Sequence, residues 1–61
     1  MKKVLVTGSD GQLGTYVVDQ LDSNFLVVPS SRMGVNSIKL DITNRKNVSA
    51  VLKEYDPDII I

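Results

Sequence analysis

Gly8, Gly11 and Gly14 recur at every third position, and this spacing constrains the fold more than any other feature of the chain. The residues before them, 3–7, form a short apolar run with β-branched side chains, which indicates a strand buried on both faces in a parallel sheet. Gly8 allows a tight turn out of that strand, Gly11 removes a side chain where backbone can approach a pyrophosphate, and Gly14 lets a helix pack close to the sheet. A strand, a glycine triplet and a helix in this order predict a turn that binds a dinucleotide.

Apolar residues then recur at helical spacing, which predicts a helix over residues 11–22. The buried stripe of this helix is expected to consist of Leu13, Tyr16, Val17 and Leu21. The apolar run 25–28 predicts a second buried strand, which Pro29 closes because proline cannot donate to a strand ladder. The polar segment 30–37 predicts a loop.

A second helix and two more strands follow. Residues 38–40 predict a short third strand, a helix over 44–55 begins after Thr43 or Asn44 as its N-cap, and residues 59–61 predict a fourth buried strand. The apolar stripe of the second helix is expected to consist of Val48, Val51, Leu52 and Tyr55. This alternation predicts an α/β fold, a partial Rossmann-type parallel sheet with flanking helices and the strand order 3-2-1-4.

The start of the first helix is the predicted phosphate site. The N–H groups of residues 11–13 have no acceptor inside the helix, so they are expected to point at the ligand, and the helix dipole adds to the attraction. Asp10 lies beside this site, and we expect it to form an Asx-turn or to cap the helix while facing solvent.

The end of the second strand indicates which dinucleotide binds. Folds that prefer the unphosphorylated cofactor place an acid there to hold the ribose 2′-hydroxyl, but residues 28–32 contain no acid. They contain two hydroxyls, Ser30 and Ser31, and the cation Arg32. Arg32 can pair with a 2′-phosphate or stay a solvated loop charge. The missing acid and the present base favour NADPH, with NADH as the other cofactor.

Asp41 and Ile42 follow the third strand, at the edge of the sheet where ligands bind in this fold. Asp41 can accept a hydrogen bond from the adenine amino group, with Ile42 against the ring. Alternatively, Asp41 caps the second helix together with Thr43. Both tyrosines lie on apolar stripes, so we expect them to pack in the core and assign neither to catalysis.

Composition excludes several classes of function. Seven basic and seven acidic residues cancel, so no overall field attracts nucleic acid or a membrane surface. Cysteine and histidine are absent from the 61 residues, which excludes disulfides, the usual zinc sites, thiol nucleophiles and imidazole bases within them. Lys3 and the other lysines are expected to be solvated. The apolar runs are too short for a membrane span and no signal peptide is evident, so a cytoplasmic protein is expected.

Three segments carry a resemblance to a known family: residues 7–14, 40–43 and 55–61. They are similar to the start of the extended short-chain dehydrogenase/reductases, and within them to the dTDP-4-dehydrorhamnose reductase branch. The resemblance covers all 61 residues but about a fifth of such an enzyme. We therefore expect residues 1–61 to be the N-terminal part of one NAD(P)-binding domain of a longer protein.

This resemblance implies an activity and a set of contacts. It implies NADPH or NADH as hydride donor to a 4-keto sugar nucleotide. The cofactor contacts that it implies are Gly11, Gln12, Leu13, Asp41 and Ile42. The catalytic tyrosine and lysine of the family lie beyond residue 61, so no catalytic residue is assigned. The expected partners of the longer protein are the dinucleotide, a sugar-nucleotide substrate and a second copy in a homodimer, with no nucleic acid or membrane.

Two other functions stay open on the sequence. One is a different member of the extended family, such as a sugar-nucleotide epimerase or dehydratase. The other is a non-catalytic regulatory subunit that keeps the fold and binds a dinucleotide. A Tyr-x-x-x-Lys pair in the rest of the longer protein would separate the enzymes from the regulatory subunit.

Overall fold

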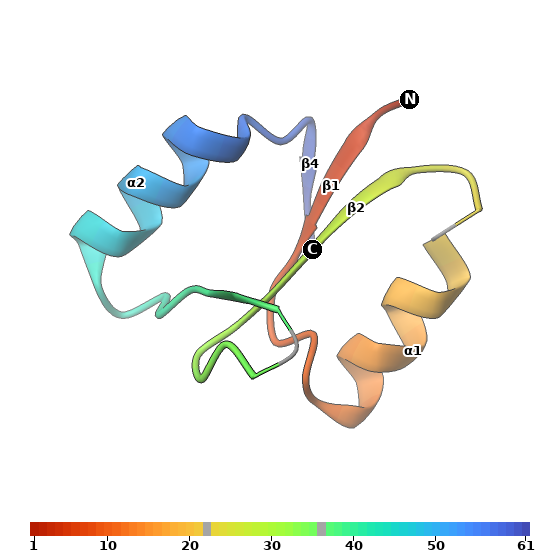
Figure 1. The fold of residues 1–61 in the computed structure, drawn as a ribbon, viewed down its shortest axis with the longest axis horizontal. Coiled ribbons are helices and arrows are strands. Elements are labelled where there is room, and N and C mark those ends of the chain that lie inside the picture. The colour runs from red at the N-terminus through yellow and green to blue at the C-terminus, as the bar shows by residue number, and fades with distance from the viewer. Residues whose placement is uncertain (22, 36) are drawn as a thin grey trace.

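The chain forms three layers in a computed structural model, which describes residues 1–21, 23–35 and 37–61. A four-stranded sheet lies in the middle, with α1 on one face and α2 on the other (Figure 1). In chain order the elements are β1 (Lys3–Val6), α1 (Gln12–Leu21), β2 (Leu26–Ser31), β3 (Ile38–Lys39), α2 (Arg45–Tyr55) and β4 (Ile59–Ile60). Residue 22, where the predicted first helix ends, lies outside the described residues.

All neighbouring strands are parallel and the order is β3-β2-β1-β4, as predicted from the alternation of apolar runs and helical stripes. In the registers, Val4 of β1 lies between Val27 and Ile59, and Ser30 of β2 pairs with Ile38. Parallel strands end at one edge of a sheet, so the turn after β1 and the segments after β2 and β3 meet there. The predicted α/β fold is confirmed.

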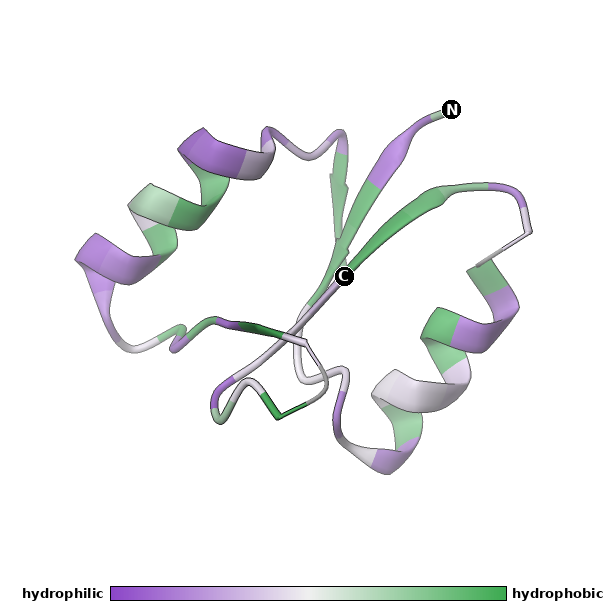
Figure 2. Cartoon of the chain, in the orientation of Figure 1, coloured by the Kyte–Doolittle hydropathy of each residue, from purple (hydrophilic) through white to green (hydrophobic). Residues whose placement is uncertain are grey.

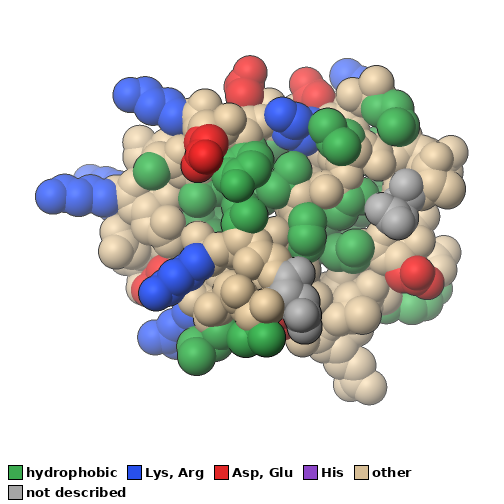
Figure 3. Space-filling view, viewed as in Figure 1, with side chains coloured by type: hydrophobic (Ala, Val, Ile, Leu, Met, Phe, Trp, Pro, Cys, Tyr) green, Lys and Arg blue, Asp and Glu red, His purple; other side chains and the backbone are tan. Residues whose placement is uncertain are grey.

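The core lies between the sheet and α2. Three buried residues form its centre: Leu5 of β1, Leu40 directly after β3 and Val51 of α2. The half-buried residues around them include Val48, Leu52 and Tyr55, so the apolar stripe predicted for α2 is confirmed. Hydrophobic residues accordingly concentrate on the strands and on the inward sides of the helices (Figure 2). Figure 3 shows hydrophobic side chains in the middle of the visible face, with Lys and Arg side chains projecting over α2.

Both ends of α2 are capped by side chains or backbone. Asn44 is the N-cap, and its side chain accepts a hydrogen bond from Asn47 N at 3.1 Å. Asp56 adopts the left-handed conformation at the other end, with φ 44°, and its N–H donates to Leu52 O. Lys3 Nζ donates to Tyr55 O at 2.7 Å, so this lysine is not the free surface charge that the sequence indicated.

The stripe predicted for α1 is wrong in two of its residues. Leu13 is 77% exposed and Tyr16 is 62% exposed, so neither packs in the core of the described chain. The helix instead turns toward β1 and β2 the face that contains Gly14, Val17 and Leu21. These residues are three or four positions apart and share one side of a helix. Glycine adds nothing to a hydrophobicity pattern, so the predicted stripe included Leu13 and Tyr16 and left out Gly14.

Pro29 does not end β2, because the strand continues to Ser31. Leu26 N donates to Lys2 O and Ser30 O accepts from Ser9 N, so even-numbered residues of β2 direct their backbone groups toward β1. Pro29 therefore faces the opposite side, where β3 begins only at Ile38. The missing N–H of Pro29 falls outside the β3 ladder, and the strand loses no bond.

The fourth strand is also less buried than predicted. Ile59 and Ile60 are exposed, because β4 lies at the edge of the sheet and, among the described strands, pairs only with β1. Backbone pairing still extends past the strand, since Ile61 N donates to Leu5 O at 2.9 Å. None of the helices in residues 1–21, 23–35 and 37–61 is long and apolar enough to cross a membrane.

Candidate functional site

The turn between β1 and α1 is built on glycine backbone. Gly8 has φ 62°, a left-handed conformation that L side chains rarely adopt. A Cβ on Gly14 would lie 2.2 Å from Gly8 O, so the first turn of α1 rests directly on the backbone of the preceding turn. The sequence predicted a close approach at Gly14, and the structure places that approach against the turn. Thr15 fixes the same turn, because its hydroxyl donates to Gly11 O at 2.8 Å.

Three backbone N–H groups at the start of α1 have no hydrogen-bond acceptor in the part of the chain that the structure describes. They belong to Gln12, Leu13 and Gly14. The N–H of Gly11 differs from its predicted role, because it donates to Gly8 O at 3.0 Å. The predicted phosphate donors are therefore shifted by one residue along the chain. Gln12 and Leu13 are exposed residues, and Gly14 is half-buried.

A cleft of about 360 Å³ lies beside this turn, at the carboxyl ends of β1, β2 and β3. Four of the eight predicted cofactor residues line it: Gly8, Arg32, Asp41 and Ile42. The other four, Gly11, Gln12, Leu13 and Gly14, lie outside the lining and belong to the start of α1. Thr7, Leu40 and Thr43 also line the cleft, and the sequence did not identify them. Their position after strands that end at one edge is the signal that could have found them.

The cleft and the turn together fit an adenosine diphosphate. Unpaired backbone N–H groups at a helix start suit the phosphates. The cleft adds one cation, Arg32, one carboxylate, Asp41, and the exposed apolar side chain of Ile42. A flat aromatic base needs such an apolar surface together with a few directed polar groups.

Arg32 is exposed and donates no hydrogen bond within residues 1–21, 23–35 and 37–61. The two hydroxyls that precede it are already engaged. Ser30 is fully buried and donates to Val6 O at 2.7 Å, and Ser31 donates to Asp10 Oδ2 at 2.6 Å. Neither serine is therefore free to hold a ribose, which leaves Arg32 as the polar group that the end of β2 offers to a ligand.

Asp10 is exposed, as predicted, but the predicted local role misses its main contacts. Its carboxylate accepts hydrogen bonds from the end of β2 and from the segment that follows it. The donors include Ser31 Oγ at 2.6 Å, Val35 N at 3.2 Å and Ser37 Oγ at 3.2 Å. These donors lie more than 20 residues away along the chain, so no local pattern could reveal them.

Asp41 does not cap α2, which has Asn44 as its N-cap. Its Oδ1 accepts from Thr43 Oγ1 at 2.6 Å and from Thr43 N at 3.0 Å, which is an Asx-turn. The hydroxyl of Thr43 chiefly holds the pKa of Asp41 below its ordinary value of 3.8, and the positive charges of Arg32 and Lys39 act in the same direction. Asp41 is therefore ionised at neutral pH, and its Oδ2 accepts no hydrogen bond from the described residues.

Two comparisons with known proteins find a match to this chain. A family model described as the RmlD substrate binding domain matches residues 1–61. A crystal structure of L-threonine dehydrogenase from Clostridium difficile is similar, with a TM-score of 0.80 and 32% sequence identity over 98% of this chain. The match covers 23% of that dehydrogenase, so the chain spans less than a quarter of its length. No curated protein matches the chain.

Proposed function

Because the chain belongs to the RmlD family, the dTDP-4-dehydrorhamnose reductases, we propose that it is the dinucleotide-binding start of a reductase that acts on a 4-keto sugar nucleotide. The family resemblance drawn from the sequence is confirmed at the level of the family. An oxidoreductase with a nicotinamide cofactor is what the family and the similar dehydrogenase support. The substrate and the preferred cofactor are parts of the proposal.

One observation carries the proposal for this chain: the start of α1 and the cleft lie side by side at one edge of a parallel sheet. Gln12 and Leu13 offer backbone N–H donors to the two phosphates. Gly11 leaves the approach to them free of a side chain. When bound, the nicotinamide of the cofactor supplies the hydride that reduces the carbonyl group.

The cleft residues hold the adenosine end. Asp41 is ionised, and its unused Oδ2 can accept a hydrogen bond from the adenine amino group. Ile42 offers an exposed apolar surface to the ring. Arg32 lines the same cleft and can pair with a 2′-phosphate, and this pairing favours NADPH over NADH.

Turnover by the full-length protein that contains these residues tests the proposal. NADPH consumption is followed by absorbance with a dTDP-4-keto-6-deoxy sugar as substrate, and the matched control omits the sugar. We expect NADPH consumption that depends on the sugar. Reduction of NAD⁺ by L-threonine without turnover of the keto sugar would instead support an amino-acid dehydrogenase, and the proposal would be wrong.

A further inference from the structure

We propose that Asp10 is a positioning residue for cofactor selection: it holds the segment that carries Arg32 and so sets how well the site distinguishes a phosphorylated ribose from an unphosphorylated one. This inference rests on the proposed binding of a dinucleotide. It assigns to the glycine-rich turn a second task, separate from holding phosphates.

The carboxylate of Asp10 is the centre of a hydrogen-bond network that includes both sides of Arg32. Ser31, directly before Arg32, donates to Asp10 Oδ2 at 2.6 Å and accepts from Gly34 N at 2.8 Å. Ser37 Oγ lies 2.9 Å from Ser31 Oγ and 3.2 Å from Asp10 Oδ1. The residues on both sides of Arg32 are therefore hydrogen-bonded either to the Asp10 carboxylate or to the Ser31 hydroxyl.

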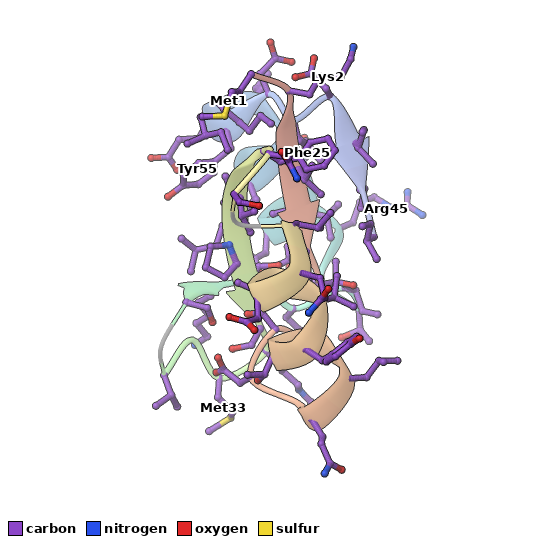
Figure 4. The ribbon with its side chains drawn as sticks, turned by 90° about the vertical axis from the view of Figure 1, so that its right-hand side faces the viewer. Met1, Lys2, Phe25, Met33, Arg45 and Tyr55 are labelled. Atoms are coloured by element: carbon purple, nitrogen blue, oxygen red, sulfur yellow. The ribbon has the colours of Figure 1, made fainter. Side chains whose placement is uncertain are left out.

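The path of this segment is further restricted at Gly34. Its φ is 66°, and a Cβ there would lie 3.0 Å from Lys39 Cβ, so the segment passes close over β3. Figure 4 shows Met33, the residue after Arg32, at the same end of the molecule as the start of α1. The segment thus lies at the same end as the phosphate donors, and hydrogen bonds to Asp10 link it to the turn.

Arg32 needs such a support because its own side chain is exposed and makes no hydrogen bond to the described residues. An unrestrained arginine loses rotamer entropy when it is fixed on a ligand. If the backbone already directs the Arg32 side chain into the cleft, fewer side-chain conformations have to be given up on binding. The affinity for the ligand is then higher. Asp10 lines a different recess, with Ser9, Thr15, Val18 and Pro29, so it acts through the segment and does not touch the ligand in the cleft.

Two possible roles of Asp10, as a negative charge and as a support for Arg32, predict opposite changes in NADPH affinity when Asp10 is removed. The inference can therefore be tested. If Asp10 acted only as a negative charge near the phosphates, its removal would strengthen binding of the more highly charged NADPH. If Asp10 positions Arg32, its removal weakens NADPH binding and leaves NADH binding nearly unchanged. A loss for both cofactors alike would instead indicate a general role in the shape of the turn.

The experiment measures dissociation constants for NADPH and NADH by calorimetry on the full-length protein. The variants are wild type, Asp10→Ala, Asp10→Asn, Arg32→Ala, the double variant Asp10→Ala/Arg32→Ala, and Asp19→Ala, which removes an equal charge from an exposed position on α1. For Asp10→Ala we expect the NADPH-to-NADH preference to fall by about threefold to tenfold, since part of one charge-assisted contact is lost. Asp10→Asn keeps one acceptor oxygen and should recover part of the preference.

The double variant decides between a direct and an indirect effect. Once Arg32 is absent, the Asp10→Ala change should no longer alter the preference, because the two residues act through one contact. The inference is wrong if Asp10→Ala strengthens NADPH binding, weakens both cofactors equally, or changes the preference in the Arg32→Ala background. If wild type binds neither cofactor, the proposed function fails as well. If wild type prefers NADPH and only Arg32→Ala removes that preference, the inference about Asp10 is wrong. The proposed function then still stands.

Discussion

Gly14 lies so close to Gly8 that a Cβ on Gly14 would be 2.2 Å from the carbonyl oxygen of Gly8. The same Cβ would lie 2.8 Å from Ser9 Cα, so the clash is with backbone on two neighbouring residues. Backbone cannot rotate away as a side chain can. The first turn of α1 can therefore pack directly against the turn after β1 only because residue 14 has no Cβ.

We predict that Gly14→Ala destabilises the protein. A helix interior favours alanine over glycine by about 1 kcal/mol, but overpacking against backbone costs about 1–3 kcal/mol and more at so short a distance. The clash should therefore prevail, and the midpoint of chemical denaturation should decrease. Gly11→Ala is the matched control, because a Cβ on Gly11 would lie 3.3 Å from Gly8 O and should cost less stability. Equal stability of Gly14→Ala and wild type would mean that α1 is not seated as described.

We predict a different result for Gly11→Val, which should abolish dinucleotide binding with little loss of stability. A Cβ on Gly11 would lie 3.3 Å from Gly8 O, a distance that a shift of a few tenths of an ångström relieves. The branched side chain would, however, stand beside the N–H groups of Gln12 and Leu13. Losing charge-assisted hydrogen bonds to a pyrophosphate costs about 1.5–3 kcal/mol each, or more than tenfold in affinity.

Thermal unfolding and cofactor titration of the Gly11→Val variant separate the two effects. Gly11→Ala provides a graded control, because it adds the Cβ without the branch. Near-normal NADPH affinity in Gly11→Val would show that the phosphates do not bind at this turn, and the proposed function would lose its main support.

The sheet order could be predicted from the sequence because each apolar run is followed by a helical or polar segment, and parallel crossovers have one handedness. The contact face of α1 could not be predicted in the same way. Leu13 and Tyr16 are apolar, so they define the stripe in any hydrophobicity pattern, whereas the contact is decided by Gly14. The closest packing in this half of the fold depends on an absent side chain, which no hydrophobicity scale registers.

The candidate site was also predicted only in part. Arg32, Asp41 and Ile42 were identified because each follows a predicted strand, and the structure brings them together in one cleft. The partner of Asp10 could not be found, because Ser31 is 21 residues away and only tertiary folding brings the two together. The sequence showed no acid after the second strand, yet the structure places the carboxylate of Asp10 at the end of that strand. Local motifs therefore locate the site, but not the contacts that arrange it.

We predict that Arg32→Ala lowers the affinity for NADPH while it leaves the affinity for NADH nearly unchanged. The loss of one charge-assisted pair at an exposed site should cost about 1–2 kcal/mol, or about fivefold to thirtyfold in affinity. Titration of wild type and variant with both cofactors measures the ratio. Arg45→Ala is the control, because it removes an exposed arginine from the start of α2, outside the lining of the cleft. An unchanged ratio in Arg32→Ala would identify Arg32 as a solvated surface charge.

The last prediction concerns the ionisation of Asp41. Thr43 holds the pKa of Asp41 below 3.8 in the folded protein, so ionised Asp41 favours the folded state above its ordinary pKa. This contribution is lost as the pH falls through the lowered folded-state value. At neutral pH the carboxylate should therefore remain an acceptor for the adenine amino group, and cofactor affinity should be insensitive to its titration.

Thr43→Val tests this arrangement, because it removes the hydroxyl that bonds to Asp41 Oδ1 and keeps the backbone N–H bond. We expect the pKa of Asp41 to rise part of the way toward its ordinary value, measured by carboxyl ¹³C shifts during an NMR titration. Ser49→Ala removes an exposed hydroxyl from α2 and should leave the pKa unchanged. Since the same hydroxyl also orients the carboxylate, Thr43→Val should weaken NADPH and NADH binding by a similar factor. An Asp41 pKa that is identical in wild type and Thr43→Val would show that the hydroxyl contact does not persist in solution.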